Sequence, residues 1–410
     1  MTQPQHTSSL VSIVTILICA ALLFAGNGLF QTLLPIRAGQ EGYSAALIGL
    51  LGTAYFGGFT LGCFIGPKLI RAVGHVRVFA GLTALLTATI LAFPLYIDPL
   101  FWGLLRVVSG ACLAVLYIVA ESWLNDASSN TNRGRILSAY IVVSNIVTMI
   151  GQLLVNASDT LEVTLFLIVA ILICLSIVPL SLTPTPAPTP VPSARLDLRK
   201  LYAVSPVGAV GCFLAGTAEG AFWSLGPVFA QGRDMITGEI ALLMAAFVLG
   251  GTLSQWPLGW ISDKIDRRIV IAAVSCGTVV SGLAIGFDVT TPGLPTLALA
   301  AMHGALMIPI YALCISHAND SIPNERMVET SSGLILAFSI GATIGPLAAA
   351  LFMGDDREGG LFVFIGLALL SLGLFTLYRM SIDSRGHLRA KKHYSATSAA
   401  SPAVFPTETE

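Results

Sequence analysis

The sequence predicts an all-α membrane protein of twelve transmembrane helices, arranged as two pseudo-symmetric six-helix bundles with both termini in the cytoplasm. Three observations lead to this fold class. The 410 residues are 55% hydrophobic and only 10% charged, whereas an ordinary soluble domain is about 25% charged. Apolar runs of about 20 residues or more, the length that crosses a bilayer as a helix, follow one another along the chain. The two halves of the sequence also resemble each other.

The apolar runs are separated by short polar or Gly/Pro-rich breaks and give twelve predicted spans. Six of them lie in the first half, near residues 10–36, 46–70, 76–97, 100–124, 136–157 and 162–182. Six lie in the second half, near residues 206–230, 237–261, 269–288, 294–317, 330–353 and 359–380. A transmembrane barrel is excluded, because its strands would be about ten residues long and would alternate in hydrophobicity.

The basic residues orient these spans. Of the 21 Lys and Arg, all fall in the loops and tail on one side of the membrane except Arg37, Arg106, Arg233 and Arg357. Cytoplasmic loops carry the excess of basic residues, so both termini are predicted to lie inside. The net charge is −1 and the basic residues are scattered between apolar runs, so the sequence offers no nucleic-acid-binding face.

The longest internal break divides the chain into domains. We predict an N-terminal six-helix bundle (1–182), a Pro-rich cytoplasmic linker (183–204), a C-terminal six-helix bundle (205–380) and a disordered cytoplasmic tail (381–410). Alternating prolines between Thr183 and Lys200 forbid a helix and favour extended polyproline II, which suits a spacer. A proline-rich docking peptide is the alternative interpretation of this stretch.

Two stretches of the first half recur in the second. Gly26 to Ile36, GNGLFQTLLPI, matches Ala218 to Val228, AEGAFWSLGPV, at an offset of 192 residues. The second match, at an offset of 194, pairs Tyr117, Ser122, Asn125 and Asp126 with Tyr311, Ser316, Asn319 and Asp320. A duplicated set of six spans is typical of a transporter whose site lies between the halves.

Two motifs resemble the major facilitator superfamily. GWISDKIDRR, from Gly259 to Arg268, is similar to the family's loop of Gly, Asp four residues later and paired basic residues, although Asp266 stands where the family usually has Gly. Arg106 and Gly110 resemble the family's R-x-x-x-G pattern on the fourth helix. Sequence segments along nearly the whole chain, such as GHVRVFAGL, AEGAFWSLGPVFAQG and SQWPLGWISD, resemble the YcaD-like branch of bacterial transporters.

The resemblance implies a secondary active transporter that moves a small polar or amphiphilic solute by alternating access, coupled to protons. It implies a multi-pass, monomeric protein of the bacterial inner (cytoplasmic) membrane, with a solute, protons and the lipid bilayer as partners and without a cofactor. A passive facilitator and a non-transporting membrane sensor on the same fold are the alternatives. Import and export both stay open, because the Gly-Pro pair expected on the fifth helix of an exporter lies on the eleventh, at Gly345-Pro346.

Three ionisable residues inside predicted spans are candidates for coupling: Glu219, Arg106 and His303. A charge at mid-bilayer costs roughly 2.5 to 3.5 kcal/mol, so such residues usually face the protein interior or a watery cavity. Glu219 is the predicted proton site, with Arg106 as its electrostatic partner or as the anchor of the solute. A fixed Glu–Arg lock is the structural alternative. His303 is either a second proton carrier or a hydrogen-bonded core histidine.

The resemblance implies that helices 1, 4, 7 and 10 line a central cavity. Polar and aromatic residues of these spans form the predicted solute-binding shell, namely Asn27, Gln31, Tyr117, Trp223 and Tyr311. Each is equally compatible with a role in helix–helix contact.

Residues at the cytoplasmic ends of the spans are the predicted gate. They are Gly74, Arg77, Glu121, Asp126, Gly259, Asp263, Arg267 and Arg268. The resemblance implies that Asp263 caps a neighbouring helix and closes the inner side, a contact that the helix dipole favours. The first-half loop has Arg71 where the corresponding acid would stand. For the basic residues, placement by the positive-inside rule is the alternative reason.

Enzymatic and metal chemistry find no support in the sequence. There is no G-x-S-x-G or HExxH motif and no group of acidic residues. The seven cysteines all lie within apolar segments without CxxC spacing, so neither disulfides nor a metal site are predicted.

Overall fold

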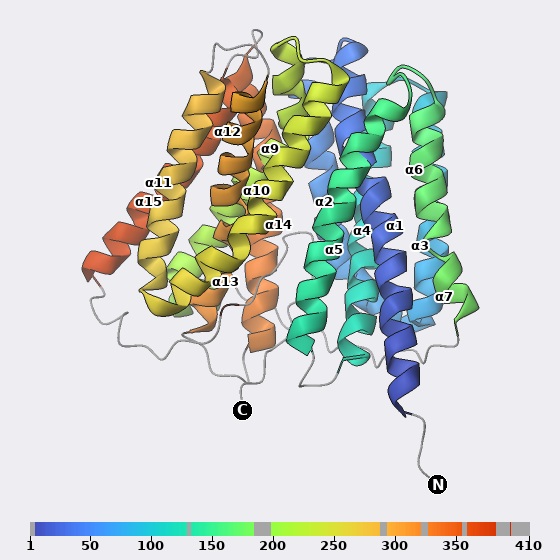
Figure 1. Ribbon diagram of the computed structural model, residues 1–410, viewed down its shortest axis with the longest axis horizontal. Helices are drawn as coiled ribbons and strands as arrows, with labels where there is room; N and C mark the ends of the chain where they lie inside the picture. The colour runs from blue at the N-terminus through green and yellow to red at the C-terminus, as the bar shows by residue number, and fades with distance from the viewer. Residues whose placement is uncertain are drawn as a thin grey trace.

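The computed structural model describes residues 5–128, 133–183, 198–287, 293–320, 327–354, 359–382 and 394. Within these ranges the chain is helical without strands and forms two bundles that stand side by side (Figure 1). α1 begins and α15 ends at the lower end of the view, which we call the inner end because the basic loops predict it to be cytoplasmic. The opposite end is called the outer end.

The first bundle contains six spans. Its elements are α1 (Gln5–Gln40), α2 (Ala45–Val73), α3 (His75–Ala92), η1 (Phe93–Leu95), α4 (Pro99–Asp126), α5 (Arg133–Leu153), η2 (Leu154–Ala157), α6 (Thr164–Leu175) and α7 (Val178–Leu182). The sixth predicted span is divided into α6 and α7, and the break precedes Pro179, whose ring cannot continue a regular helix.

The second bundle repeats this arrangement. It contains α9 (Pro206–Gly232), α10 (Thr237–Lys264), α11 (Arg267–Gly286), α12 (Leu294–Met307), α13 (Pro309–Asn319), α14 (Met327–Met353) and α15 (Gly360–Ile382). The short helix α8 (Leu198–Val204) precedes it. The predicted linker therefore ends in a helix, whereas its proline-rich part, 184–197, lies outside the described residues. So does the predicted disordered tail, apart from 381–382 and Tyr394.

Eleven helical segments of the described chain are long and apolar enough to cross a membrane. The seventh predicted span, α9, is not among them, although it is 27 residues long. Its sequence is rich in glycine and includes Glu219, and nearly every residue from Ala215 to Ala230 is buried. A helix enclosed by other helices does not need the apolar surface that lipid demands, so α9 has a weaker hydropathy signal than its neighbours.

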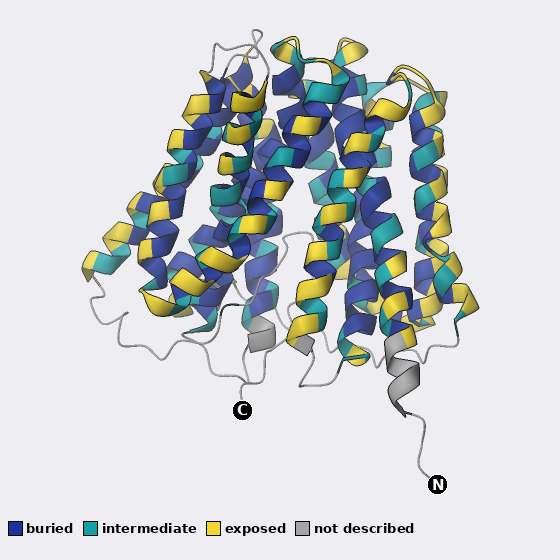
Figure 2. Cartoon of the chain, in the orientation of Figure 1, coloured by how far each residue is buried: buried dark blue, intermediate teal, exposed yellow. Residues whose placement is uncertain are grey.

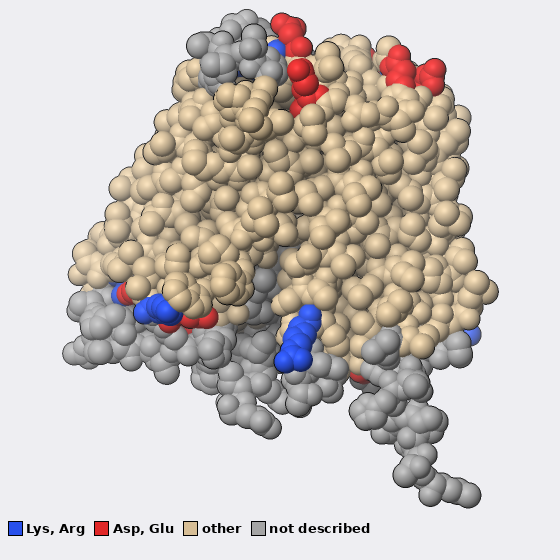
Figure 3. All heavy atoms as spheres, viewed as in Figure 1, with Lys and Arg blue, Asp and Glu red and all other residues tan. Residues whose placement is uncertain are grey.

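The surface agrees with a membrane environment. Buried residues face the inside of the bundles, and exposed positions follow the outward faces of the helices (Figure 2). Many of the exposed side chains are large and apolar, including Leu253, Trp256 and Val280. The charged residues visible in Figure 3 lie near the two ends of the molecule, and a broad uncharged band separates them. That band is the expected contact with the hydrocarbon core of the bilayer.

Glycines bring helices of the second bundle into close contact. A Cβ on Gly250 of α10 would overlap the carbonyl oxygen of Ala301 on α12, and a Cβ on Gly304 of α12 would overlap the carbonyl oxygen of Phe247. The two backbones therefore approach each other through a reciprocal pair of glycines, the kind of small-residue crossing that membrane helices use.

The two bundles touch mainly toward the outer end. Gln231 Nε2 of α9 donates to the carbonyl oxygen of Ile36 at 2.9 Å, and Gly238 of α10 lies against the side chain of Asn156 in η2. Deeper in the molecule, Thr53 of α2 donates to the carbonyl oxygen of Thr343 on α14 at 2.8 Å. These contacts close the interface between the bundles at its outer end.

Candidate functional site

A cavity of about 130 Å³ lies between the two bundles, below the outer contacts. The first bundle contributes residues of α1, α2, α4 and α5, and the second contributes residues of α9, α10 and α14 together with Ile308 at the α12–α13 junction. A single water molecule needs about 10 to 15 Å³ of such space, so the cavity has room for a small solute. Its position between the repeats matches the site predicted from the duplication.

Aromatic side chains cover much of the cavity wall. They are Phe24, Tyr55, Phe56, Phe59, Tyr117, Trp223 and Phe338. In the first bundle, Phe24 and Tyr117 are stacked with ring centroids 4.6 Å apart and planes 9° from parallel. The ring of Phe59 lies 6.4 Å from Tyr117. The first bundle therefore presents a continuous aromatic surface to the cavity.

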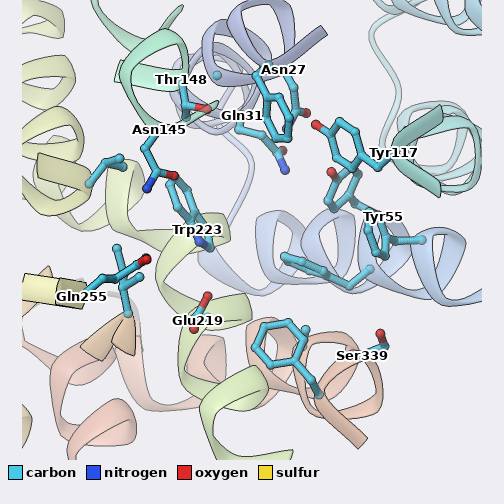
Figure 4. Close-up of a pocket in the computed structure, with 18 residues that line it drawn as sticks. Asn27, Gln31, Tyr55, Tyr117, Asn145, Thr148, Glu219, Trp223, Gln255 and Ser339 are labelled. Carbon is cyan, nitrogen blue, oxygen red and sulfur yellow. The ribbon is translucent and has the colours of Figure 1, made fainter. Parts of the chain in front are cut away.

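Polar side chains interrupt this surface at a few positions. Asn27, Gln31, Asn145, Thr148, Gln255 and Ser339 line the cavity together with Glu219. In Figure 4, Asn27, Gln31 and Tyr117 lie close together, and Glu219 projects from α9 on the opposite side. Glu219 is the only carboxyl or basic side chain in the lining that the structure describes.

One carboxyl oxygen of this lining, Glu219 Oε1, is buried without a hydrogen-bond partner in the described protein. The side chain of Asn27, in contrast, lies within hydrogen-bonding reach of Tyr55 and Tyr117. Glu219 is 5% exposed, and it takes part in none of the ion pairs found among the described residues. Buried polar atoms in folded proteins almost always have partners, so an unpartnered carboxyl oxygen in a cavity wall points to a ligand-binding site.

Arg106 lies behind the cavity wall and not in it. Its Nη1 donates to Gln31 Oε1 at 2.9 Å and its Nε to the carbonyl oxygen of Leu51 at 3.3 Å. Its guanidinium stacks 4.2 Å from the ring centroid of Tyr55. The predicted contact between Arg106 and Glu219 does not occur among these interactions. Arg106 instead fixes two cavity residues, because both Gln31 and Tyr55 line the cavity.

His303 and Tyr311 belong to the core of the second bundle. His303 is fully buried, its Nδ1 lies 3.0 Å from Ser281 Oγ, and the rings of Phe222, Phe247 and Phe362 surround it. Tyr311 is 1% exposed. Neither residue lines the cavity, so α12 and α13 contribute less to it than the resemblance implied.

The predicted gate residues of the second bundle form an ion-pair network and a further ion pair at the inner end. Arg267, only 1% exposed, forms ion pairs with Asp263 and Asp320, each at 2.8 Å. Arg268 pairs with Asp266 at 2.7 Å. Burial alone would raise the pKa of the Asp266 carboxyl, but the hydrogen bonds from Arg268 outweigh burial and hold that pKa below its usual value. Asp263 thus joins α10 to α11 within its own bundle.

A residue of the tail completes this network. The backbone N–H of Tyr394 donates to both carboxylate oxygens of Asp263, at 3.0 and 3.3 Å. A Cβ on Gly259 would overlap the ring of Tyr394, so the glycine makes room for the tyrosine. No pattern in the sequence indicates this contact.

The gate residues of the first bundle are not brought together in the same way. Gly74 has a φ of 86° and connects α2 directly to α3, a conformation that favours glycine. Arg77 and Asp126 are exposed. Glu121 is fully buried and accepts a hydrogen bond from Tyr140 at 3.5 Å. The two inner ends therefore differ in charge and contacts despite the repeat.

Sequence reasoning missed several cavity residues. Tyr55, Asn145, Thr148, Gln255 and Ser339 all line the cavity, on α2, α5, α10 and α14. A signal was present for two of them, because Asn145 and Gln255 are isolated amides within apolar spans, as are Asn27 and Gln31. The assumption that only four helices line the cavity excluded them.

Comparison with known proteins agrees with this architecture. The family model of the Major Facilitator Superfamily matches residues 16–235 and 208–405. An MFS-type transporter of Enterobacter sp. (strain 638) is 26% identical over 356 residues, covering 86% of this chain and 92% of the relative. The MFS-type transporter YcaD of Escherichia coli O17:K52:H18 is 26% identical over 352 residues, covering 84% of this chain and 89% of the relative.

Solved structures show the same fold. The nucleoside transporter NupG superposes with a TM-score of 0.73 at 13% identity, covering 90% of this chain and 98% of that structure. A bacterial homologue of the lysosomal transporter Spinster, in an inward-facing conformation, gives 0.70 at 15% identity, covering 95% and 100%. Two repeated bundles around one central cavity, together with the family match, identify the chain as a membrane transporter that belongs to the major facilitator superfamily and is similar to its YcaD-like members.

Proposed function

We propose that the protein is a proton-coupled secondary transporter that moves a small amphiphilic solute across the bacterial inner membrane by alternating access, as a monomer. The cavity between the bundles is the proposed solute site. The outer contacts close one side of it, so this conformation is taken as the one that exchanges solute with the cytoplasm. Rocking of the bundles about the cavity would open the other side.

The observation that carries the proposal is the buried carboxyl of Glu219 in the cavity wall. A carboxylate that is buried without a partner costs several kcal/mol. Glu219 must therefore be accompanied by a proton or by a positive group of the solute whenever the cavity is closed to water. A carrier with this requirement cannot change conformation while the Glu219 carboxylate is charged and binds neither a proton nor the solute. This restriction couples the movement of the solute to the movement of protons.

The remaining site residues receive supporting roles in this proposal. Arg106 holds Gln31 and Tyr55 in position from behind the wall, so that it orients the solute site without touching the solute. His303 keeps a structural role in the second bundle, because its ring is enclosed by phenylalanines. At the inner gate, the pairs of Arg267 with Asp263 and Asp320 would rearrange when the bundles close there.

Proton flux driven by a solute tests the proposal. Proteoliposomes containing a pH-sensitive dye are exposed in turn to nucleosides, sugars, amino acids, short peptides and aromatic amines, without any imposed gradient. At least one class is expected to change the lumenal pH in vesicles with the protein and not in empty vesicles.

A passive facilitator is the alternative that this experiment separates. It would equilibrate a solute across the membrane without moving protons and without accumulating the solute against its gradient. Solute entry that leaves the lumenal pH unchanged would reject proton coupling and favour the facilitator.

A further inference from the structure

The charge and shape of the cavity lining define the class of solute that fits it. Seven aromatic rings and a single carboxyl group line the cavity, and no Lys, Arg or His does so among the described residues. The nearest buried cation, Arg106, directs its guanidinium at Gln31, Leu51 and the ring of Tyr55. The lining is therefore acidic and aromatic, with no group that would compensate an anionic solute.

We propose, on the basis of the transport function above, that the solute is an aromatic or heteroaromatic amine carried as a monocation, and that it exchanges with a proton at Glu219. The ring of the solute would lie against Phe24, Tyr55 and Tyr117 of the first bundle. Its positive group would meet the carboxylate of Glu219 on the second. One solute thus bridges both bundles, which is what a carrier needs in order to couple binding to their movement.

The aromatic wall favours a cation over a neutral solute. A cation over an aromatic face gains about 0.5 to 2 kcal/mol, and more where water is excluded. The unpartnered carboxyl oxygen also suits an amine, because Glu219 Oε1 needs a donor. A neutral polyol would instead place several hydroxyl groups against aromatic rings that cannot accept their hydrogen bonds. Each hydrogen bond that is not made costs free energy of binding.

The groups around Glu219 leave no protein cation to neutralise it. Tyr311 of α13 and Cys212 of α9 are ionisable groups of the same region, and Tyr55 and Tyr117 lie in the same cavity. These four are uncharged at neutral pH. α14 presents Phe338, Ser339 and Ala342 to the cavity, and α10 presents Val248 and Gln255, none of which is ionisable. A proton and a cationic solute are therefore the two available counter-charges, and they compete for one site.

Binding of two planar probes tests this class of solute. The purified full-length protein is titrated with N-methylacridinium, a permanent cation, and with N-methylacridone, its neutral counterpart. The cation is expected to bind at least about tenfold more tightly at alkaline pH, as an added cation–π and ionic contact would give. Its affinity should fall by up to about tenfold for each unit that the pH is lowered, because one proton replaces one cation. In weak buffer, each bound cation should release one proton.

Variants assign the effect to Glu219. In Glu219→Gln, the pH dependence of cation binding and the proton release should disappear, and the preference for the cation should fall to the part that the aromatic wall supplies. The affinity for N-methylacridone should stay within about twofold. Glu162→Gln, at an exposed carboxyl far from the cavity, should behave as the unmodified protein. Size-exclusion profiles and thermal stability verify that both variants are folded.

The outcomes separate this inference from the transport proposal. Equal binding of the two probes or no binding of either overturns the assignment of a cationic solute, and a cation preference that keeps its full size and pH dependence in Glu219→Gln overturns the exchange at Glu219. If proton flux with a neutral solute is observed together with any of these results, the transport function stands and only the solute class is rejected. If the cation binds through Glu219 but no solute drives protons, the coupling is rejected and the binding class stands.

Discussion

Gly52→Leu is expected to reduce solute transport by at least about 100-fold while the protein remains folded. The reason is that a carrier that cannot close one side of its cavity cannot complete the transport cycle. A Cβ on Gly52 of α2 would overlap the side chain of Ser224 on α9 and lie 2.9 Å from Pro346 Cβ on α14. Both neighbours belong to the other bundle. The leucine side chain would prevent the bundles from packing together at their outer contact, and it would therefore favour the conformation that is open to the outside.

Thiol labelling measures this shift. A cysteine at Ser339, in a background without native cysteines, reports which side of the membrane reaches the cavity. A membrane-impermeant reagent added from outside should label it faster in Gly52→Leu than in the parent protein. Gly103→Leu on α4 is the matched control, because nothing lies within 4 Å of a Cβ there. Normal transport by Gly52→Leu would show that the outer contacts are not a gate.

Arg106→Leu is expected to weaken solute binding by about 10-fold or more, because Gln31 Oε1 loses a charged donor inside the protein. The carbonyl oxygen of Leu51 and the face of Tyr55 lose the same partner. A double-mutant cycle on solute affinity distinguishes this role from direct pairing with Glu219. Arg106→Leu and Gln31→Leu should be coupled by about 1 to 2 kcal/mol.

The second arm of the cycle combines Arg106→Leu with Glu219→Gln. Because no contact joins these two side chains in the structure, their effects should add within about 0.5 kcal/mol. Arg106→Lys provides a control that keeps the charge but not the planar fork of donors. Strong coupling of Arg106 to Glu219, with no coupling to Gln31, would instead support the ion pair predicted from the sequence.

The sequence predicts the architecture well because that information is local. Apolar runs and a repeat at a nearly constant offset are enough for an all-helical membrane fold of two similar bundles. Glu219 could also be singled out, since a lone acid in an apolar span needs a special environment. Asn27, Gln31, Tyr117 and Trp223, chosen as polar or aromatic residues of the predicted spans, also line the cavity.

The partners of these residues could not be predicted, because they depend on helix rotation and depth. Arg106 turns toward Gln31 and Tyr55 because α1 and α2, and not α9, pack beside it. His303 lies in the tenth predicted span, which the resemblance placed in the cavity lining, yet its ring faces Ser281 on α11. Tyr394 reaches Asp263 across more than a hundred residues of sequence, and no local pattern encodes such a contact.

The most direct test of the central claim, that Glu219 in the cavity couples solute movement to protons, compares accumulation with exchange in Glu219→Gln. Proteoliposomes are loaded with a solute that passes the proton-flux screen, and uptake is followed with and without an imposed pH gradient. The unmodified protein should accumulate the solute when the gradient is present. Glu219→Gln should still exchange labelled for unlabelled solute, but it should bring the solute only to equal concentrations on both sides. Accumulation by Glu219→Gln to the level of the unmodified protein would contradict the account.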